Sequence, residues 1–282
     1  MTTTAETLGP MTNRATLSLA WRFARARYWR SLPFFVVFLV FTAISLALQK
    51  HVQPSIFVMH PDPRTYPPFP DTALVITSVL MGFVVGLVSL GLYRSIWLGL
   101  SADEFRIANL LWGARFPELW LLPVLSAVVT PLQFMAQAAT RGHAMLTLLF
   151  MIFVWLLSIV LGYAYALVAR EPLPAATAVR HAAGIFQRGR RRLIGLVFQA
   201  AAWALLGAVG FAVIAVPLAF VVKALHIAHP IFALIIVTVL IVAALGLFLL
   251  AVVYWTAVAL LAAGSLVAGR LTPTVNGLSD VE

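Results

Sequence analysis

Histidines and aspartates beside the apolar runs of this 282-residue chain are the side chains best suited to bind a metal ion. His226 and His229 have a spacing that can place both imidazole rings on one face of a helix, as zinc and copper sites require. Imidazole is also comfortable at a membrane interface, and His229 directly precedes Pro230, where a helix should end. We therefore expect no metal site. The other members of this set, all expected on the same side of the molecule, are His51, His60, His143, Asp62 and Asp71.

Catalytic motifs are lacking in the sequence. It contains no cysteine, no H-E-x-x-H, no G-x-S-x-G and no glycine-rich phosphate loop. Serines within the apolar runs are expected to bond the preceding turn or a neighbouring helix rather than act as nucleophiles. We expect no catalytic residue, no cofactor and no enzymatic activity. These serines are Ser45, Ser89, Ser126 and Ser158.

Composition indicates that lipid is the solvent of these residues. Apolar residues make up 62% of the chain, charged residues 10%, and the mean hydropathy is +1.01. A soluble domain of this length has about half its residues apolar and a quarter charged. We expect an all-α polytopic membrane protein with one domain, residues 1–282, and flexible ends at 1–13 and 271–282. Six runs have the length of a membrane span: Ser31–Gln49, Thr72–Leu98, Pro117–Ala139, His143–Ala169, Leu193–Leu225 and Ile231–Ala268.

The basic residues predict the orientation in the membrane. With the N-terminus inside, 15 of the 19 Lys and Arg residues fall on the inner side, including Arg188 and Arg190–Arg192 just before the fifth span. The composition, with 17 Arg and 2 Lys, is typical of a GC-rich bacterial gene. We expect a bacterial inner-membrane protein with both termini cytoplasmic. Because the arginines gather at the ends of apolar runs, the net charge of +10 does not indicate nucleic-acid binding.

Three inner segments are predicted to be amphipathic helices lying at the membrane surface, at residues 14–30, 101–115 and 174–188. In the second, Ser101-Ala102-Asp103-Glu104 matches a capping box. Each segment precedes a pair of spans, so three repeated hairpin units are expected, near residues 14–100, 101–172 and 173–272. The predicted apolar faces are Leu17, Ala20, Trp21, Ala24 and Tyr28, then Ile107, Leu110, Leu111 and Ala114, then Ala178, Val179, Ala182, Ile185 and Phe186.

Ionisable residues are lacking at the centres of the six predicted spans, which disfavours a proton or ion pathway. The inner arginines are instead candidates to contact anionic lipid head groups, because guanidinium groups grip phosphate oxygens in pairs. A solvated charge network among the arginines and the acidic residues Asp103, Glu104 and Glu118 is the alternative. The candidate lipid contacts are Arg22, Arg25, Arg30, Arg94, Arg106, Arg115, Arg188, Arg190, Arg191 and Arg192.

Three stretches carry a resemblance to known membrane proteins: LSLAWRFARARYWRSLPFF, GLYRSIWLGLSADEFRIANLLWG and YALVAREPLPAATAVRHAAGIFQRGRRRL. In each, aromatic and small residues stand next to a short polar turn and a basic amphipathic run. This layout resembles YciC-like bacterial inner-membrane proteins and the membrane domain attached to some glycerophosphodiester phosphodiesterases. The resemblance implies a membrane module and carries over no catalytic residue.

These observations together predict a non-enzymatic inner-membrane protein that binds lipid or supports a membrane partner protein. The alternative is a transporter for an uncharged or amphipathic solute, which proline-broken helices favour and the lack of buried charge disfavours.

Overall fold

A computed structural model describes residues 12–52, 72–139, 144–171, 173–228 and 230–276, and within these ranges the chain is helical, with no strand. The helices coincide in position with the six apolar runs of the sequence. The α-helices are α1 (Asn13–Val52), α2 (Thr72–Ser101), α3 (Leu121–Ala139), α4 (Ala144–Arg170), α5 (Ala175–Ala228) and α6 (Pro230–Asn276). Short 3₁₀ helices η2 (Ile107–Leu111), η3 (Gly113–Arg115) and η4 (Pro117–Leu119) join α2 to α3.

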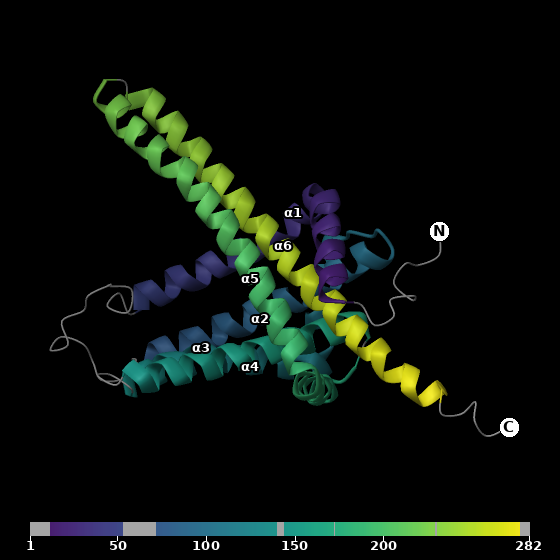
Figure 1. Ribbon diagram of the computed structural model, residues 1–282. Coiled ribbons are helices and arrows are strands. Elements are labelled where there is room, and N and C mark those ends of the chain that lie inside the picture. Colours follow the sequence, from purple (N-terminus) through teal and green to yellow (C-terminus); the bar gives the residue numbers. More distant parts are fainter. Residues whose placement is uncertain (1–11, 53–71, 140–143, 172, 229, 277–282) are drawn as a thin grey trace.

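The six α-helices pack as three antiparallel pairs, α1 with α2, α3 with α4, and α5 with α6 (Figure 1). The second helix of each pair also packs on the first helix of the next, and α6 closes the circle on α1. The return helices α2, α4 and α6 contact one another as well, so they form the inside of the bundle.

Four helices in the described part of the chain are long and apolar enough to cross a membrane. The sequence predicts six such spans, and the four found among the described residues lie in α1, α2, α4 and α6. The described part of the chain is thus all-helical and contains four candidate membrane-spanning segments: Asn13–Leu48, Thr72–Ser101, Leu148–Arg170 and Ala233–Gly264.

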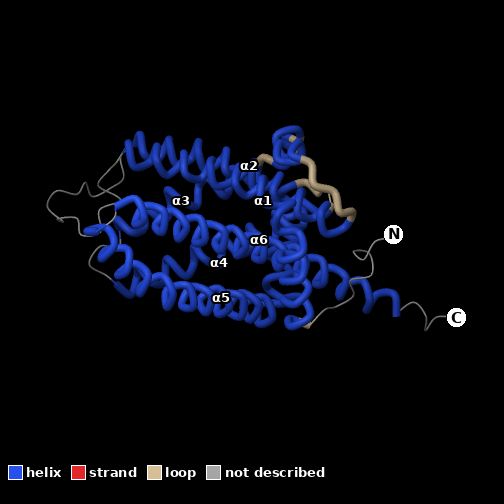
Figure 2. The backbone as a smooth tube through the Cα atoms, turned by 90° about the horizontal axis from the view of Figure 1, so that it is seen from above, coloured by secondary structure: helices blue, strands red, loops and turns tan. Residues whose placement is uncertain are grey.

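Two of the three segments predicted to be amphipathic surface helices are helical, and each is continuous with the long helix that follows it. The starts of α1 and α5 run across the direction of α2, α3 and α4 (Figures 1 and 2). Thr12 caps α1, since its hydroxyl oxygen accepts from the backbone N–H of Ala15 at 3.3 Å. The predicted apolar faces are buried at Leu17, Ala20, Ala24, Ala178, Ala182 and Ile185, while Arg14, Arg22, Arg25, Arg180, His181 and Arg188 are exposed.

The prediction of a second surface helix, at residues 101–115, is wrong. Ser101 does not begin a helix but is the last residue of α2, and its hydroxyl donates to the carbonyl oxygen of Trp97 at 2.8 Å. Asp103 follows with a left-handed backbone (φ 55°), and its carboxylate binds α1 instead of capping a helix. The chain then proceeds in 3₁₀ turns, so of its predicted apolar stripe only Leu110 is buried.

Glycines of α2 explain why this segment and α3 lie so close to it. A Cβ atom at Gly91 would overlap the backbone of Leu110, and one at Gly86 would lie 2.8 Å from the Cα atom of Pro123 in α3. Gly82 is in a similar position, 2.9 Å from the Cα atom of Ala127. Gly82 and Gly86 are one helical turn apart, the small-xxx-small spacing that lets membrane helices approach closely.

The C-terminal part of α6 continues to Asn276, past residue 270, where the sequence predicts a flexible end. The proline-rich stretch at residues 53–71 lies outside the described residues.

Candidate functional site: a basic end and an apolar cleft

Most of the described arginines lie at the end of the molecule where α1 and α5 begin and where α2 and α4 end, which we call the basic end. Asn13 and Arg192 connect the two crossing segments there. The Asn13 Nδ2 donates to the carbonyl oxygen of Arg192 at 3.3 Å, and the Arg192 Nε donates to the Asn13 Oδ1 at 3.0 Å. The chain entering α1 is thereby attached to the arginine run at residues 188–192.

Asp103 connects the turn after α2 to the same end. Its two carboxylate oxygens accept from Arg27 Nε at 2.7 Å and from Arg30 Nη1 at 2.9 Å. Hydrogen bonds from Arg27 and then Arg30 hold the pKa of Asp103 below its ordinary value. All three side chains are partly exposed, so the link orients the turn more than it stabilises the fold.

Arg94 has an internal role that its sequence position does not reveal. Its Nη1 donates to the carbonyl oxygen of Ala169 at 2.6 Å, and its guanidinium group lies 5.2 Å from the ring centre of Trp112. The last carbonyls of a helix lack partners within the helix, so Arg94 satisfies the end of α4. Arg170, at that same end, lies over the ring of Trp97. Arg94 is therefore used inside the protein.

The ten arginines predicted to contact lipid thus separate into two groups. Arg94 and Arg192 are half-buried and bonded within the bundle, while Arg30 pairs with Asp103 and Arg106 lies 3.7 Å from Glu104. The other six are exposed, and no ion pair is recorded for them among the described residues. These six are Arg22, Arg25, Arg115, Arg188, Arg190 and Arg191.

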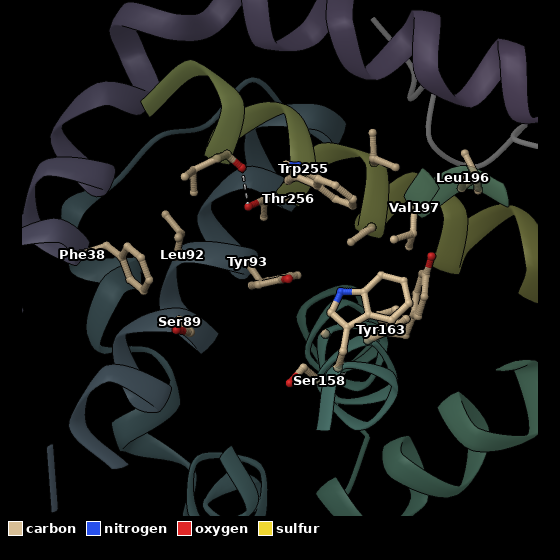
Figure 3. Close-up of a pocket in the computed structure, with 16 residues that line it drawn as sticks. Phe38, Ser89, Leu92, Tyr93, Ser158, Tyr163, Leu196, Val197, Trp255 and Thr256 are labelled. Carbon is tan, nitrogen blue, oxygen red and sulfur yellow. Dashed lines mark hydrogen bonds between the residues drawn. The ribbon is translucent and has the colours of Figure 1, made fainter. Parts of the chain in front are cut away.

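A partly open cleft of about 470 Å³ lies beside the basic end, between α1, α2, α4, α5 and α6. Figure 3 shows the side chains of Phe38, Leu92, Tyr93, Tyr163 and Trp255 around it. No charged side chain is among its sixteen lining residues. A volume of this size is within the range of roughly 300–1,000 Å³ that small-molecule sites occupy.

Each return helix contributes one serine or threonine to the cleft: Ser89 from α2, Ser158 from α4 and Thr256 from α6. All three hydroxyl groups donate to the carbonyl oxygen four residues earlier, at 2.7, 2.9 and 2.9 Å. The expectation that Ser89 and Ser158 bond the preceding turn is confirmed. Because their protons are used, these hydroxyls present only acceptor lone pairs to the cleft.

The hydrogen-bond donors in the lining of the cleft are the phenols of Tyr93 and Tyr163 and the indole N–H groups of Trp155 and Trp255. Within the described chain no hydrogen-bond partner is recorded for the phenol oxygen of Tyr93 or of Tyr163, both of which line the cleft. Tyr165, on the neighbouring face of α4, behaves differently and shares a 3.0 Å hydrogen bond with Ser126 of α3. Ser126 therefore joins neighbouring helices, as predicted.

Sequence reasoning missed the cleft because its lining residues resemble ordinary apolar helix faces. A signal was present in the similar positions of Ser89 and Tyr93 in α2 and of Ser158 and Tyr163 in α4, each pair close to the inner end of a return helix. Such pairs identify a site only when the helices that carry them are known to meet.

Most of the histidines and aspartates considered as metal ligands lie outside the described residues. His60, His143 and His229, with Asp62 and Asp71, are in the undescribed parts, and the side chain of His226 is not described. Within the described ranges, no group of three or more His, Asp or Glu side chains is arranged to hold a metal ion.

The chain shows no similarity to a known protein that would assign a role to the basic end or the cleft. No family model matches it, and neither a curated protein nor a solved structure matches it. Any functional conclusion must therefore come from the geometry.

Proposed function

We propose that this chain is a non-enzymatic bacterial inner-membrane protein that binds anionic phospholipid through its basic end. The observation that carries this proposal is the set of exposed arginines on the crossing segments of α1 and α5 that form no ion pair with another described residue. Each basic side chain near an anionic leaflet contributes about 1 kcal/mol of attraction. The similarity of its layout to YciC-like membrane proteins supports a membrane module of this kind.

The proposal includes six spans with both termini in the cytoplasm. In addition to the four long apolar helices, α3 has 19 residues, and at about 1.5 Å per residue it extends roughly 28 Å, close to the ~30 Å of a bilayer core. The part of α5 that follows Arg192 is longer than α3. Three hairpins with the basic end inside agree with the distribution of arginines along the chain.

Three repeated units account for the packing order. Each unit consists of a segment at the basic end, an outward helix and a return helix, and contacts among α2, α4 and α6 support this arrangement. The 3₁₀ segment η2–η4 replaces the crossing helix in the second unit.

The proposal is tested by replacing Arg22, Arg25, Arg188 and Arg190 together with glutamine and measuring the retained lipid by native mass spectrometry. We expect a several-fold loss of bound phosphatidylglycerol, because four attractive charges are removed. The matched control carries lysine at the same four positions, which preserves the charge and should preserve the bound lipid. Equal lipid retention by the glutamine variant and the wild type would refute the proposal.

The second candidate function is transport of an uncharged or amphipathic solute, and the partly open cleft is the observation that favours it. Its lining is apolar except for hydroxyl and indole N–H groups, and the described residues around it bring no acidic or basic side chain into it. Solute flux into protein-containing liposomes, absent from protein-free liposomes, would favour this candidate over lipid binding alone.

A further inference from the structure

We propose that the cleft between the return helices holds one acyl chain of an anionic phospholipid from the leaflet on the basic side, with the head group toward the basic end. This inference rests on the proposed function and assigns the place where the lipid tail lies. The lining of the cleft contains no charged side chain. A charged group placed there would lose its hydration without gaining a partner, so the buried part of the occupant must be apolar.

Both Trp155 and Tyr163 of α4 line the cleft, and they are about 12 Å apart along the helix at ~1.5 Å per residue. Tyr163 is nearer to Arg170, the end of α4 at the basic end. The cleft therefore runs from the basic end toward the middle of the bundle, the direction in which a phospholipid of that leaflet extends its chains.

The inner end of the cleft has the chemistry of a head-group site. The phenols of Tyr93 and Tyr163 offer hydrogen-bond donors there. Two O–H donors fit the ester carbonyl oxygens of a phospholipid, and the exposed arginines of the basic end attract its anionic phosphate.

The apolar part of the lining fits a hydrocarbon chain. It includes Trp155, Ile159 and Trp255, and the ring of Trp155 makes an edge contact with Phe198 of α5 at 6.0 Å. These side chains can cover an alkyl chain on several sides but offer no charged partner to a polar solute.

Gly162 allows the cleft to be filled without disturbing the bundle. A Cβ atom at this position meets only the phenol oxygen of Tyr93, at the ordinary contact distance of 3.6 Å. Gly162→Leu therefore places a side chain in the cleft. Ala259→Leu, on the facing wall formed by α6, does the same independently. Ala243→Leu adds the same side chain to α6 at an exposed position and is the matched control.

The experiment uses the full chain in liposomes containing phosphatidylglycerol with a photoreactive diazirine in one acyl chain. After illumination, labelled peptides are located by mass spectrometry. We expect labels on α4 near residues 155–159 and on α6 near residues 252–256, reduced several-fold by Gly162→Leu and Ala259→Leu but unchanged by Ala243→Leu. Tyr163→Phe should lower this labelling while leaving the thermal stability unchanged.

Three outcomes would overturn the inference. Labels spread evenly over the exposed face of α6 and unaffected by either filling variant would show that the cleft holds no chain. Loss of the label on adding a long-chain fatty acid, but not on adding unlabelled phosphatidylglycerol, would assign the cleft to a free fatty acid. Equal labelling by a phosphatidylcholine probe would show that the cleft does not require an anionic head group. The four-arginine variant tests the proposed function separately, since its lipid retention does not depend on which residues are labelled.

Discussion

Apolar helices form both the contact between α2 and α3 and the outer part of the α5–α6 hairpin. The two regions differ in the share of their residues that is buried within the protein. In α2, 28% of the most apolar stretch is buried within the protein, whereas in α6, the more apolar helix, the share is 6%. Large side chains such as Val239, Ile241 and Val242 of α6 are more than 60% exposed. Figure 1 shows the α5–α6 hairpin extending away from the other helices.

The difference shows that apolar character and burial are separate properties in this chain. Where helices touch closely, the residues are small, as at Gly82 and Gly86 against Ala127 and Pro123. Where the residues are large and branched all around the helix, the surface faces outward. This is expected when lipid is the solvent, because hydrocarbon gives apolar side chains no reason to seek one another and only close packing favours association.

The largest expected effect tests whether the outer α5–α6 surface lies in lipid. Val242→Asp places a carboxylate near the middle of an exposed apolar helix, at a cost of about 2.5–3.5 kcal/mol if that position is in the membrane core. We expect a strong loss of protein in the membrane fraction, measured by quantitative immunoblotting. Ala102→Asp, at an exposed position of the basic end, should have little effect. Similar yields of the two variants would show that this surface does not face lipid.

The next prediction tests the close contact between α2 and α3. Gly86→Leu drives a side chain into the backbone of Pro123, and overpacking of this kind costs about 1–3 kcal/mol. We expect a clear fall in the melting temperature of the purified protein in detergent. Ala243→Leu, which adds the same group to the exposed face of α6, should leave the melting temperature nearly unchanged. A comparable fall in both variants would contradict the distinction between packed and lipid-facing helices.

The smallest effect concerns Asp103 at the basic end. Because its folded pKa is lowered by Arg27 and Arg30, its stabilising contribution is present above the ordinary aspartate pKa and is lost as pH falls through the lowered value. We expect Asp103→Asn to reduce the melting temperature slightly at neutral pH and the two curves to converge in strong acid. The partly exposed position keeps the effect small. A constant difference at all pH values would mean that the carboxylate charge is not involved.

Sequence alone determined the helical class, the positions of the six helices and the faces of two crossing segments. These follow from local properties: long apolar runs, helical periodicity, and arginines gathered at the run ends. The same reasoning failed at Ser101–Glu104. A capping box is a local pattern, but Asp103 is engaged by Arg27 and Arg30, more than seventy residues earlier in the chain.

Tertiary structure decided which arginines are exposed and where the cleft lies. Arg94 and Arg188 have similar surroundings in the sequence, at the inner end of an apolar run, yet only Arg94 meets the carbonyl end of another helix. Ser89, Ser158 and Thr256 are separated by about seventy to a hundred residues each, and their common cleft exists because α2, α4 and α6 pack together. Local composition determines each helix, whereas helix contacts depend on small residues whose partners lie far away in the chain.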